Sequence, residues 1–195
     1  MFYFEEINGK KILKSSVLNG LQHFFTTRES VIKTKEPDFE ETVKENKKDI
    51  CKFLGIEEEN LIHPSQTHTS NVEIARAGIS SYPDTDGLIL ANHKQAVYLN
   101  FADCTPVIIF DPINQIAAVS HAGWRGTAGN IASKTVQKMK AEFGSNPENL
   151  SAAIHKIRTI ATKIISNVIQ SPFPYIYEPQ NKSCAHIIRQ FCNKG

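Results

Sequence analysis

Three residues that commonly bind metal ions or act as nucleophiles stand at the ends of strand-like segments of this chain. His68 lies in "HPSQTHTSNV" just before such a segment, Cys104 divides two apolar runs, and His121 ends a third run in "SHAGWRGT". One thiolate and two imidazoles suit Zn²⁺, and three protein ligands leave a fourth tetrahedral position open. Cys104 follows His68 by 36 residues and precedes His121 by 17. The three therefore meet only if their strands are neighbours in one sheet.

The same residues allow a second chemistry that needs no metal. Cys104 is able to act as a nucleophile with His121 as its base, provided that a third group orients the imidazole. The chain has seven histidines and four cysteines, and no cysteine pair has CxxC spacing. Metal ligation, nucleophilic catalysis and ordinary packing all stay open for these residues at this stage.

Four further residues are candidates for supporting roles. Asp103 and Asp86 are each able to serve as a general acid or base, or to orient a ligand histidine. For Asp86, the turn-like sequence "DTDG" favours a local Asx-turn instead. Arg125 stands between glycines directly ahead of a helical segment, where a guanidinium and free backbone N–H groups together suit an anion. For Trp124 we expect burial in the core.

The hydrophobic pattern predicts the elements that must position these residues. Helical spacing with a closing glycine predicts helices over 43–55 and 128–143, the second with Thr127 as its N-cap. The middle of the chain is predicted to run from a strand through a loop with candidate site residues into a second strand. A second loop with candidate site residues and then a helix follow. Alternating or β-branched runs predict strands near 71–75, 87–91, 96–102, 106–110 and 115–120, besides one or two within residues 1–30.

Composition is typical of a one-domain globular protein. The chain has 195 residues, is 41% hydrophobic and carries a formal net charge of +2, so neither a nucleic-acid nor an acidic-membrane partner is indicated. No apolar run reaches the roughly 18 residues that a membrane span needs. The N-terminal residues include acidic side chains and no continuous apolar stretch, unlike a signal peptide. We expect a cytoplasmic location and reduced cysteines.

The last part of the chain differs in composition from the rest. Residues 155–195 contain one acidic and six basic residues, whereas residues 1–154 contain 19 acidic and 16 basic ones. We therefore expect one zinc-binding catalytic domain over 1–154. Over 155–195 we expect a divergent basic tail, poorly ordered or translated from another reading frame.

Several segments taken together resemble a known protein family. "QTH", "DTDGLI", "ADCTPVIIFD" and "HAGWRGT", in this order, are similar to the YfiH family, also called the multicopper polyphenol oxidase or laccase-domain family. "FFTTR" and "ENKKDICKFLGI" resemble the early segments of that family. The resemblance covers roughly residues 20–154. It implies an α+β fold, a sandwich of mixed β-sheets flanked by helices.

The resemblance also implies a site and an activity. It implies zinc bound by His68, Cys104 and His121, and action on purine nucleosides and phosphate. The implied reactions are phosphorolysis of adenosine, inosine and methylthioadenosine, and deamination of adenosine by a zinc-activated water. Arg125 would then contact phosphate, and Asp103 would move protons. Copper is the alternative ion, but phenol oxidation is disfavoured because these three ligands cannot hold the several coppers that reduction of dioxygen requires.

The chain departs from the family pattern in two places. After "AAI" the family continues with a Gly/Pro-rich segment that carries another cysteine, whereas this chain leaves that pattern at about His155. The loop over 29–42 is short and lacks the family's glycine-rich segment. Two other functions therefore stay open beside the zinc enzyme. One is a metal-free Cys–His hydrolase or deamidase, and the other is a zinc-binding remnant with impaired catalysis.

Overall fold

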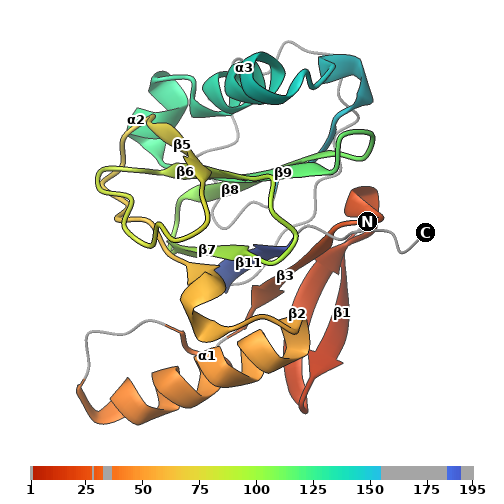
Figure 1. Ribbon diagram of the computed structural model, residues 1–195. Helices are drawn as coiled ribbons and strands as arrows, with labels where there is room; N and C mark the ends of the chain where they lie inside the picture. The colour runs from red at the N-terminus through yellow and green to blue at the C-terminus, as the bar shows by residue number, and fades with distance from the viewer. Residues whose placement is uncertain (1, 28, 33–36, 155–183, 190–195) are drawn as a thin grey trace.

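Two β-sheets packed face to face form the centre of the molecule, and one long helix covers the outer face of each (Figure 1). The computed structural model describes residues 2–27, 29–32, 37–154 and 184–189. One apolar cluster fills the space between the sheets, and two others lie between each sheet and its helix. This arrangement confirms the expected α+β sandwich of mixed sheets flanked by helices.

The six-stranded sheet combines N-terminal, central and C-terminal strands. Its neighbouring pairs are antiparallel except for one parallel pair, β4 with β7. No strand was predicted over Cys184–Arg189, the residues of β11, which joins the N-terminal strands to β7. The division of the chain at residue 154 stays a prediction, because most residues after it lie outside the described part. In spatial order the strands are β1 (Phe2–Ile7), β2 (Lys10–Ser15), β3 (Gln22–Thr26), β11 (Cys184–Arg189), β7 (Ala96–Phe101) and β4 (Leu61–Ile62).

The five-stranded sheet carries the candidate site residues. Along β8, Ile108 and Phe110 face the other sheet, while Val107 and Ile109 face the covering helix. Because both faces are covered, β8 and β9 read as continuous apolar runs in the sequence. The five strands predicted between residues 71 and 120 are confirmed: four of them lie in this sheet, and β7 lies in the six-stranded sheet. In spatial order the sheet consists of β10 (Ser151–Ile154), β8 (Thr105–Asp111), β9 (Ile116–Ala122), β6 (Gly87–Leu90) and β5 (Val72–Ala75), with only β5 and β6 parallel.

The helices begin and end at residues with special backbone angles. Helix α1 (Glu40–Leu54) closes at Gly55, whose φ of 62° is the left-handed cap that the sequence predicted. The second helix, predicted over 128–143, begins three residues later as α3 (Ile131–Phe143), because Asn130 before it has a φ of 59°, and a separate short helix, α2 (Trp124–Ala128), precedes it. Thr127 lies inside α2, so its predicted N-cap role is wrong. Single 3-10 turns are η1 (Ser16–Leu18), η2 (Pro37–Phe39), η3 (Glu58–Asn60) and η4 (Pro147–Asn149).

None of the helices in the described residues combines the length and the apolar character that crossing a bilayer requires. The cytoplasmic location expected from the sequence stays a prediction.

His23 is a buried histidine that makes the six-stranded sheet sensitive to acid. Its Nε2 accepts a hydrogen bond from the Ser15 N–H (2.9 Å), so Nδ1 carries the proton and donates to the Leu21 carbonyl (2.9 Å). Burial lowers the pKa of His23 from 6.5 to about 4. As pH falls, the unfolded chain takes up this proton first. Stability that is fully present above pH 6.5 is therefore lost between pH 6.5 and 4, by about 3 kcal/mol.

Urea unfolding of the wild type and of His23→Gln between pH 7 and 4 checks this prediction. The variant, which has no titrating group at this position, is expected to lose less stability over the same interval. Equal losses in the two proteins would contradict the role of His23.

Candidate metal centre

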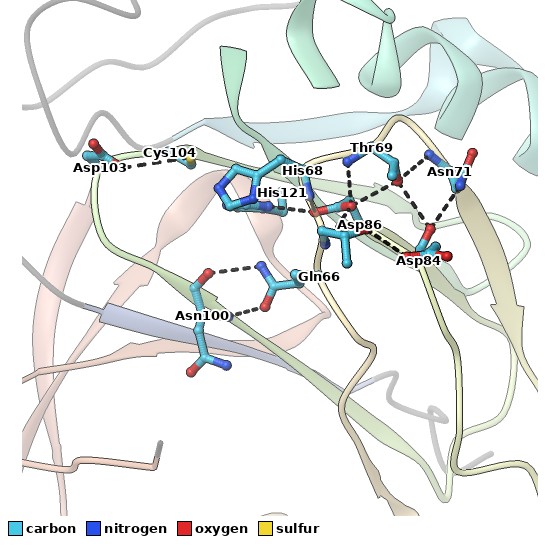
Figure 2. A network of polar contacts seen from close by, with 11 residues as sticks. Gln66, His68, Thr69, Asn71, Asp84, Asp86, Asn100, Asp103, Cys104 and His121 are labelled. Carbon is cyan, nitrogen blue, oxygen red and sulfur yellow. Dashed lines mark hydrogen bonds and ion pairs between the residues drawn. The ribbon is translucent and has the colours of Figure 1, made fainter. Parts of the chain in front are cut away.

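The three residues singled out as metal ligands converge at one end of the five-stranded sheet. Their ligand atoms all lie within 4.8 Å of one another. Cys104 directly precedes β8 and His121 lies in β9, and the antiparallel pairing of these strands places Pro106 opposite His121. The hairpin therefore brings the thiol beside the imidazole. Figure 2 shows the His68 ring meeting both from the loop ahead of β5.

The loop that carries His68 is held against the six-stranded sheet by Gln66. The side-chain amide of Gln66 accepts from the Asn100 N–H (2.8 Å) and donates to the Asn100 carbonyl (2.9 Å), as a neighbouring strand would. Two residues later, His68 has a φ of 65°, which is uncommon for a residue with a side chain. The sequence placed His68 before a strand but gave no sign of this backbone conformation.

Asp86 lies at the centre of the polar network in Figure 2. It is fully buried and accepts hydrogen bonds from His121 Nδ1 (2.7 Å), from the backbone N–H groups of Thr67, His68 and Thr69, and from the Thr69 hydroxyl. Burial by itself raises the pKa of Asp86. The hydrogen bonds from His121, Thr69 and Thr67 outweigh burial and lower the pKa to about 2. Asp86 is therefore an ionised carboxylate at neutral pH.

The Asx-turn favoured for Asp86 from the sequence is wrong. The partners of its carboxylate lie 17 to 35 residues away in the chain, so no local pattern around "DTDG" could have indicated them. The other reading considered from the sequence, a carboxylate that orients a ligand histidine, describes the observed contact. Such carboxylate–imidazole pairs are the usual outer arrangement around histidines that bind zinc.

The thiol of Cys104 is half-buried beside an exposed carboxylate. Burial, and then the negative charges of Asp103 and Asp86, raise the pKa of Cys104 to about 11. Asp103 Oδ1 lies 3.8 Å from Cys104 Sγ and accepts a weak hydrogen bond from it. A metal ion must displace the thiol proton to bind here. One thiolate and two imidazoles at this spacing fit a single Zn²⁺ ion.

Helix α2 lies tightly against the centre because one of its faces is made of glycine. A methyl group at Gly123 would lie 3.0 Å from Cys104 Sγ, and one at Gly126 would lie 2.9 Å from the Thr69 carbonyl oxygen. A methyl group at Gly129, the cap of α2, would lie 2.7 Å from a side-chain oxygen of the His68 loop. Gly123 and Gly126, which the sequence suggested as the flanks of an anion site, therefore allow α2 to pack closely against the candidate ligands.

The close packing predicts that Gly126→Ala damages the metal centre. The new methyl group would meet the carbonyl oxygens of Thr69 (2.9 Å) and His121 (3.2 Å), and backbone atoms cannot turn aside as a side chain can. We expect zinc affinity to fall about tenfold or more and stability to fall by about 1–3 kcal/mol. Competition with a chromophoric chelator measures the affinity. Ala128→Ser, at an exposed position of the same helix, is the control and should bind zinc as the wild type does.

The other face of α2 carries Trp124 and Arg125 into solvent. Trp124 is 68% exposed, so its predicted burial in the core is wrong. The reason is that the glycine face of this short helix occupies the buried side. The Arg125 guanidinium lies 5.0 Å from the centroid of the Trp124 ring, within the range of a cation–π interaction. The phosphate contact and the proton transfer expected of Arg125 and Asp103 stay predictions.

A groove of about 580 Å³ is lined by β5, by the loop over 76–85 and by α3. Asn71, Asp84 and Lys138 are among its lining residues, whereas none of the three candidate ligands lines it. Lys138 donates to the Val72 carbonyl (2.6 Å) on edge strand β5. A lysine of this kind protects a sheet edge from pairing with other chains. The groove therefore makes no contact with the candidate metal ligands.

Comparison with known proteins identifies the family of a chain with this fold and site. Residues 23–168 match the family model described as multi-copper polyphenol oxidoreductase laccase. The chain belongs to this family. The match includes all three candidate ligands and the resemblance seen in the sequence is confirmed. It also continues to residue 168, so the expectation that nothing after about residue 155 resembles the family is wrong.

Two relatives of this chain are enzymes by name, and each is less than a third identical to it over the aligned residues. It is 28% identical over 144 residues to a purine nucleoside phosphorylase of Deinococcus radiodurans, which covers 69% of this chain and 56% of that protein. It is 32% identical over 110 residues to adenosine deaminase RL5 of an unknown prokaryotic organism, covering 52% and 42%. The chain thus spans about half the length of these curated relatives.

The fold is shared with a protein whose crystal structure has been solved. The crystal structure of the Bacillus licheniformis hypothetical protein YfiH superposes with a TM-score of 0.80 at 19% sequence identity, covering 96% of this chain and 99% of that one. At this identity the likeness shows the fold alone.

Proposed function

We propose that this protein is a zinc-dependent purine nucleoside phosphorylase that also acts on methylthioadenosine and deaminates adenosine. The observation that carries the proposal is the Cys–His–His group within 4.8 Å, with one histidine oriented by a buried carboxylate. Zinc bound there would supply Lewis acidity and activate water. Relatives named purine nucleoside phosphorylase and adenosine deaminase supply the substrate class.

The proposed reactions give each residue a distinct task. Phosphorolysis adds phosphate to C1′ of the ribose and releases the base, whereas deamination exchanges the amino group at C6 for an oxygen from water and releases ammonia. His68, Cys104 and His121 hold the ion. Arg125, exposed on α2, binds phosphate, and Asp103, exposed beside Cys104, transfers protons.

The number of ligands disfavours oxidation of phenols by several coppers. Three ligand atoms within 4.8 Å hold one ion, and the part of the chain that the structure describes forms no second group of this kind. A multicopper oxidase needs further imidazole and thiolate ligands to bind its other ions. Copper could replace zinc as a single ion, but one ion does not supply the four electrons that reduce dioxygen to water.

The chemistry of Cys104 also disfavours a metal-free Cys–His hydrolase or deamidase. Nucleophilic cysteines have a lowered pKa, because the thiolate is the reactive form. Burial and two neighbouring carboxylates raise the pKa of Cys104 to about 11 instead. A metal-free nucleophile would keep its activity after chelation and lose it on alkylation, whereas the zinc enzyme should lose activity after chelation and regain it with zinc.

A direct assay tests the proposal. Protein loaded with one equivalent of zinc, as measured by elemental analysis, is incubated with adenosine, with and without phosphate. Chromatography is expected to show adenine and ribose 1-phosphate only when phosphate is present, and inosine in both reactions. Methylthioadenosine should give its free base when phosphate is present. Absence of all these products in zinc-loaded protein would refute the proposed enzymatic activity. The protein would then be a zinc-binding remnant with impaired catalysis.

Arg125→Ala is expected to raise the KM for phosphate about tenfold or more. A charge-assisted hydrogen bond to phosphate contributes roughly 1.5–3 kcal/mol, and the methyl side chain cannot replace it. Zinc content and adenosine deamination should stay unchanged, because Arg125 is no ligand. Phosphate titrations of the phosphorolysis rate measure the effect. Arg76→Ala, which removes an exposed arginine at the groove that none of the candidate ligands lines, is the control. An unchanged KM for phosphate would show that Arg125 does not bind phosphate.

A further inference from the structure

We propose that Asp86 is a positioning residue that fixes both histidines of the metal centre before any metal binds. One of its oxygen atoms, Oδ1, accepts from the His121 ring at Nδ1 (2.7 Å) and from the backbone N–H of His68 (3.1 Å). The two histidines come from segments that are far apart in the sequence, and this oxygen atom joins them. The role rests on the metal centre of the proposed function.

The first effect of Asp86 is on the backbone around His68. Its second oxygen atom, Oδ2, accepts from the N–H groups of Thr67 (3.2 Å) and Thr69 (2.7 Å) and from the Thr69 hydroxyl (2.9 Å). Three consecutive N–H groups thus point at one carboxylate, and His68 in their middle has a φ of 65°. Several charge-assisted hydrogen bonds outweigh the strain of one left-handed residue. Asp86 therefore stabilises the backbone conformation that presents the His68 ring.

The second effect is on the protonation of the His121 ring. Because the carboxylate only accepts hydrogen bonds, Nδ1 of His121 must carry the proton when the ring is neutral. Nε2 then has a free lone pair, and it is the nitrogen available on the side of Cys104 and His68. A neutral histidine binds metal through its unprotonated nitrogen. Asp86 thus selects the tautomer that can bind metal.

Asp86 is able to do this because its own position is fixed. Its carbonyl accepts from the His121 N–H (2.7 Å), and its N–H donates to the Asn71 carbonyl (3.1 Å). Asp86 and His121 are therefore joined twice, once through the backbone and once through the side chains. The carboxylate is also fully buried. The histidines are therefore already oriented in the metal-free protein.

Asp86→Asn is the informative variant because it keeps the shape of the side chain while it removes the negative charge and replaces one acceptor by a donor. All five contacts of the carboxylate are with donors, so an amide group at either oxygen position faces N–H groups. The conflict is smallest where the amide faces His121, since the ring can shift its proton from Nδ1 to Nε2 and accept. That tautomer cannot bind metal through Nε2.

Two measurements test the role of Asp86. Long-range ¹H–¹⁵N NMR of the metal-free protein is expected to show the Nδ1–H tautomer of His121 in the wild type and the Nε2–H tautomer in Asp86→Asn. Chelator competition is expected to show zinc affinity about ten- to a hundredfold lower in Asp86→Asn. Asp84→Asn, two residues away at an exposed position, should match the wild type in both measurements, because its side chain accepts only from the Thr67 hydroxyl (3.2 Å).

A second variant separates positioning from general weakening of the loop. Thr69→Val removes one donor to Oδ2 and leaves the contact between Asp86 and His121 in place. It should lower the melting temperature while keeping the Nδ1–H tautomer and zinc affinity within threefold of the wild type. If Thr69→Val lost zinc as Asp86→Asn does, loop stability and not positioning would explain both.

An Nε2–H tautomer in the metal-free wild type would overturn the role of Asp86, as would equal zinc affinity of Asp86→Asn and Asp84→Asn. The tautomer measurement needs only wild-type protein, so it decides the question even if Asp86→Asn does not fold. Failure of the wild type to bind zinc would instead refute the proposed function. The two ideas therefore fail by different results.

Discussion

Cys104→Ala is expected to abolish stoichiometric zinc binding and nucleoside turnover together. The substitution removes the one thiolate of the centre and leaves two imidazoles, too few to hold zinc in a catalytic site. Changes to groups that merely support a ligand lower metal affinity by about 10–100-fold, so loss of a ligand should cost at least about a hundredfold. The melting temperature should also stop responding to zinc. In the wild type, zinc at a thousand times its Kd stabilises the fold by about 4 kcal/mol.

Cys51→Ala is the matched control for Cys104→Ala. It makes the same chemical change at a buried free cysteine of α1, outside the metal centre. It is expected to lose some packing stability while it binds one zinc ion and turns over adenosine as the wild type does. Elemental analysis, thermal unfolding with and without zinc, and the adenosine assay compare the two variants. Zinc retained at one equivalent in Cys104→Ala would show that Cys104 is not a ligand.

This comparison has three possible results, and each supports one of the three functions left open by the sequence. Joint loss of zinc and turnover supports the zinc enzyme. Turnover that resists chelation but needs Cys104 supports a Cys–His hydrolase or deamidase. A zinc-dependent melting temperature with no turnover in the wild type supports a remnant with a structural ion.

The sequence predicted that the three candidate ligands could meet, because Cys104 and His121 lie at strand ends and His68 lies in the loop ahead of a strand. The apolar runs on either side of the turn near residues 111–114 predict a hairpin, and a hairpin necessarily brings Cys104 and His121 together. His68 required one more assumption, that its strand belongs to the same sheet, and β5 does lie in that sheet. Local pattern and simple strand geometry therefore account for the convergence of these three residues.

The remaining features depend on contacts between distant segments. Asp86 looked like a turn residue because its nearest neighbours are turn residues, while its partners come from other elements. Trp124 was expected in the core because it is large and apolar, yet the space beneath α2 is filled by the glycine face of that helix. Strand β11 owes its place to pairing with β3 and β7. None of these facts is present in a short stretch of sequence.

Zinc affinity is expected to rise about tenfold per pH unit between pH 7 and 9. Burial, Asp103 and Asp86 raise the pKa of Cys104 to about 11, so the metal-free thiol is protonated throughout this interval. Binding of zinc must release that proton, and the thiolate fraction grows tenfold for each pH unit below the pKa. Over two units the gain is about a hundredfold, or about 2.7 kcal/mol. Asp86 adds no dependence here, because its pKa of about 2 keeps it ionised.

Chelator competition at several pH values measures this slope, and calorimetry in two buffers of different ionisation enthalpy counts the released proton. Cys104→Asp is the control for the titrating thiol. It replaces the thiol by a carboxylate, whose ordinary pKa near 3.9 lies far below this interval. The variant should bind zinc more weakly and with a flatter pH profile. A flat profile in the wild type would contradict the displacement of a thiol proton from Cys104 when zinc binds.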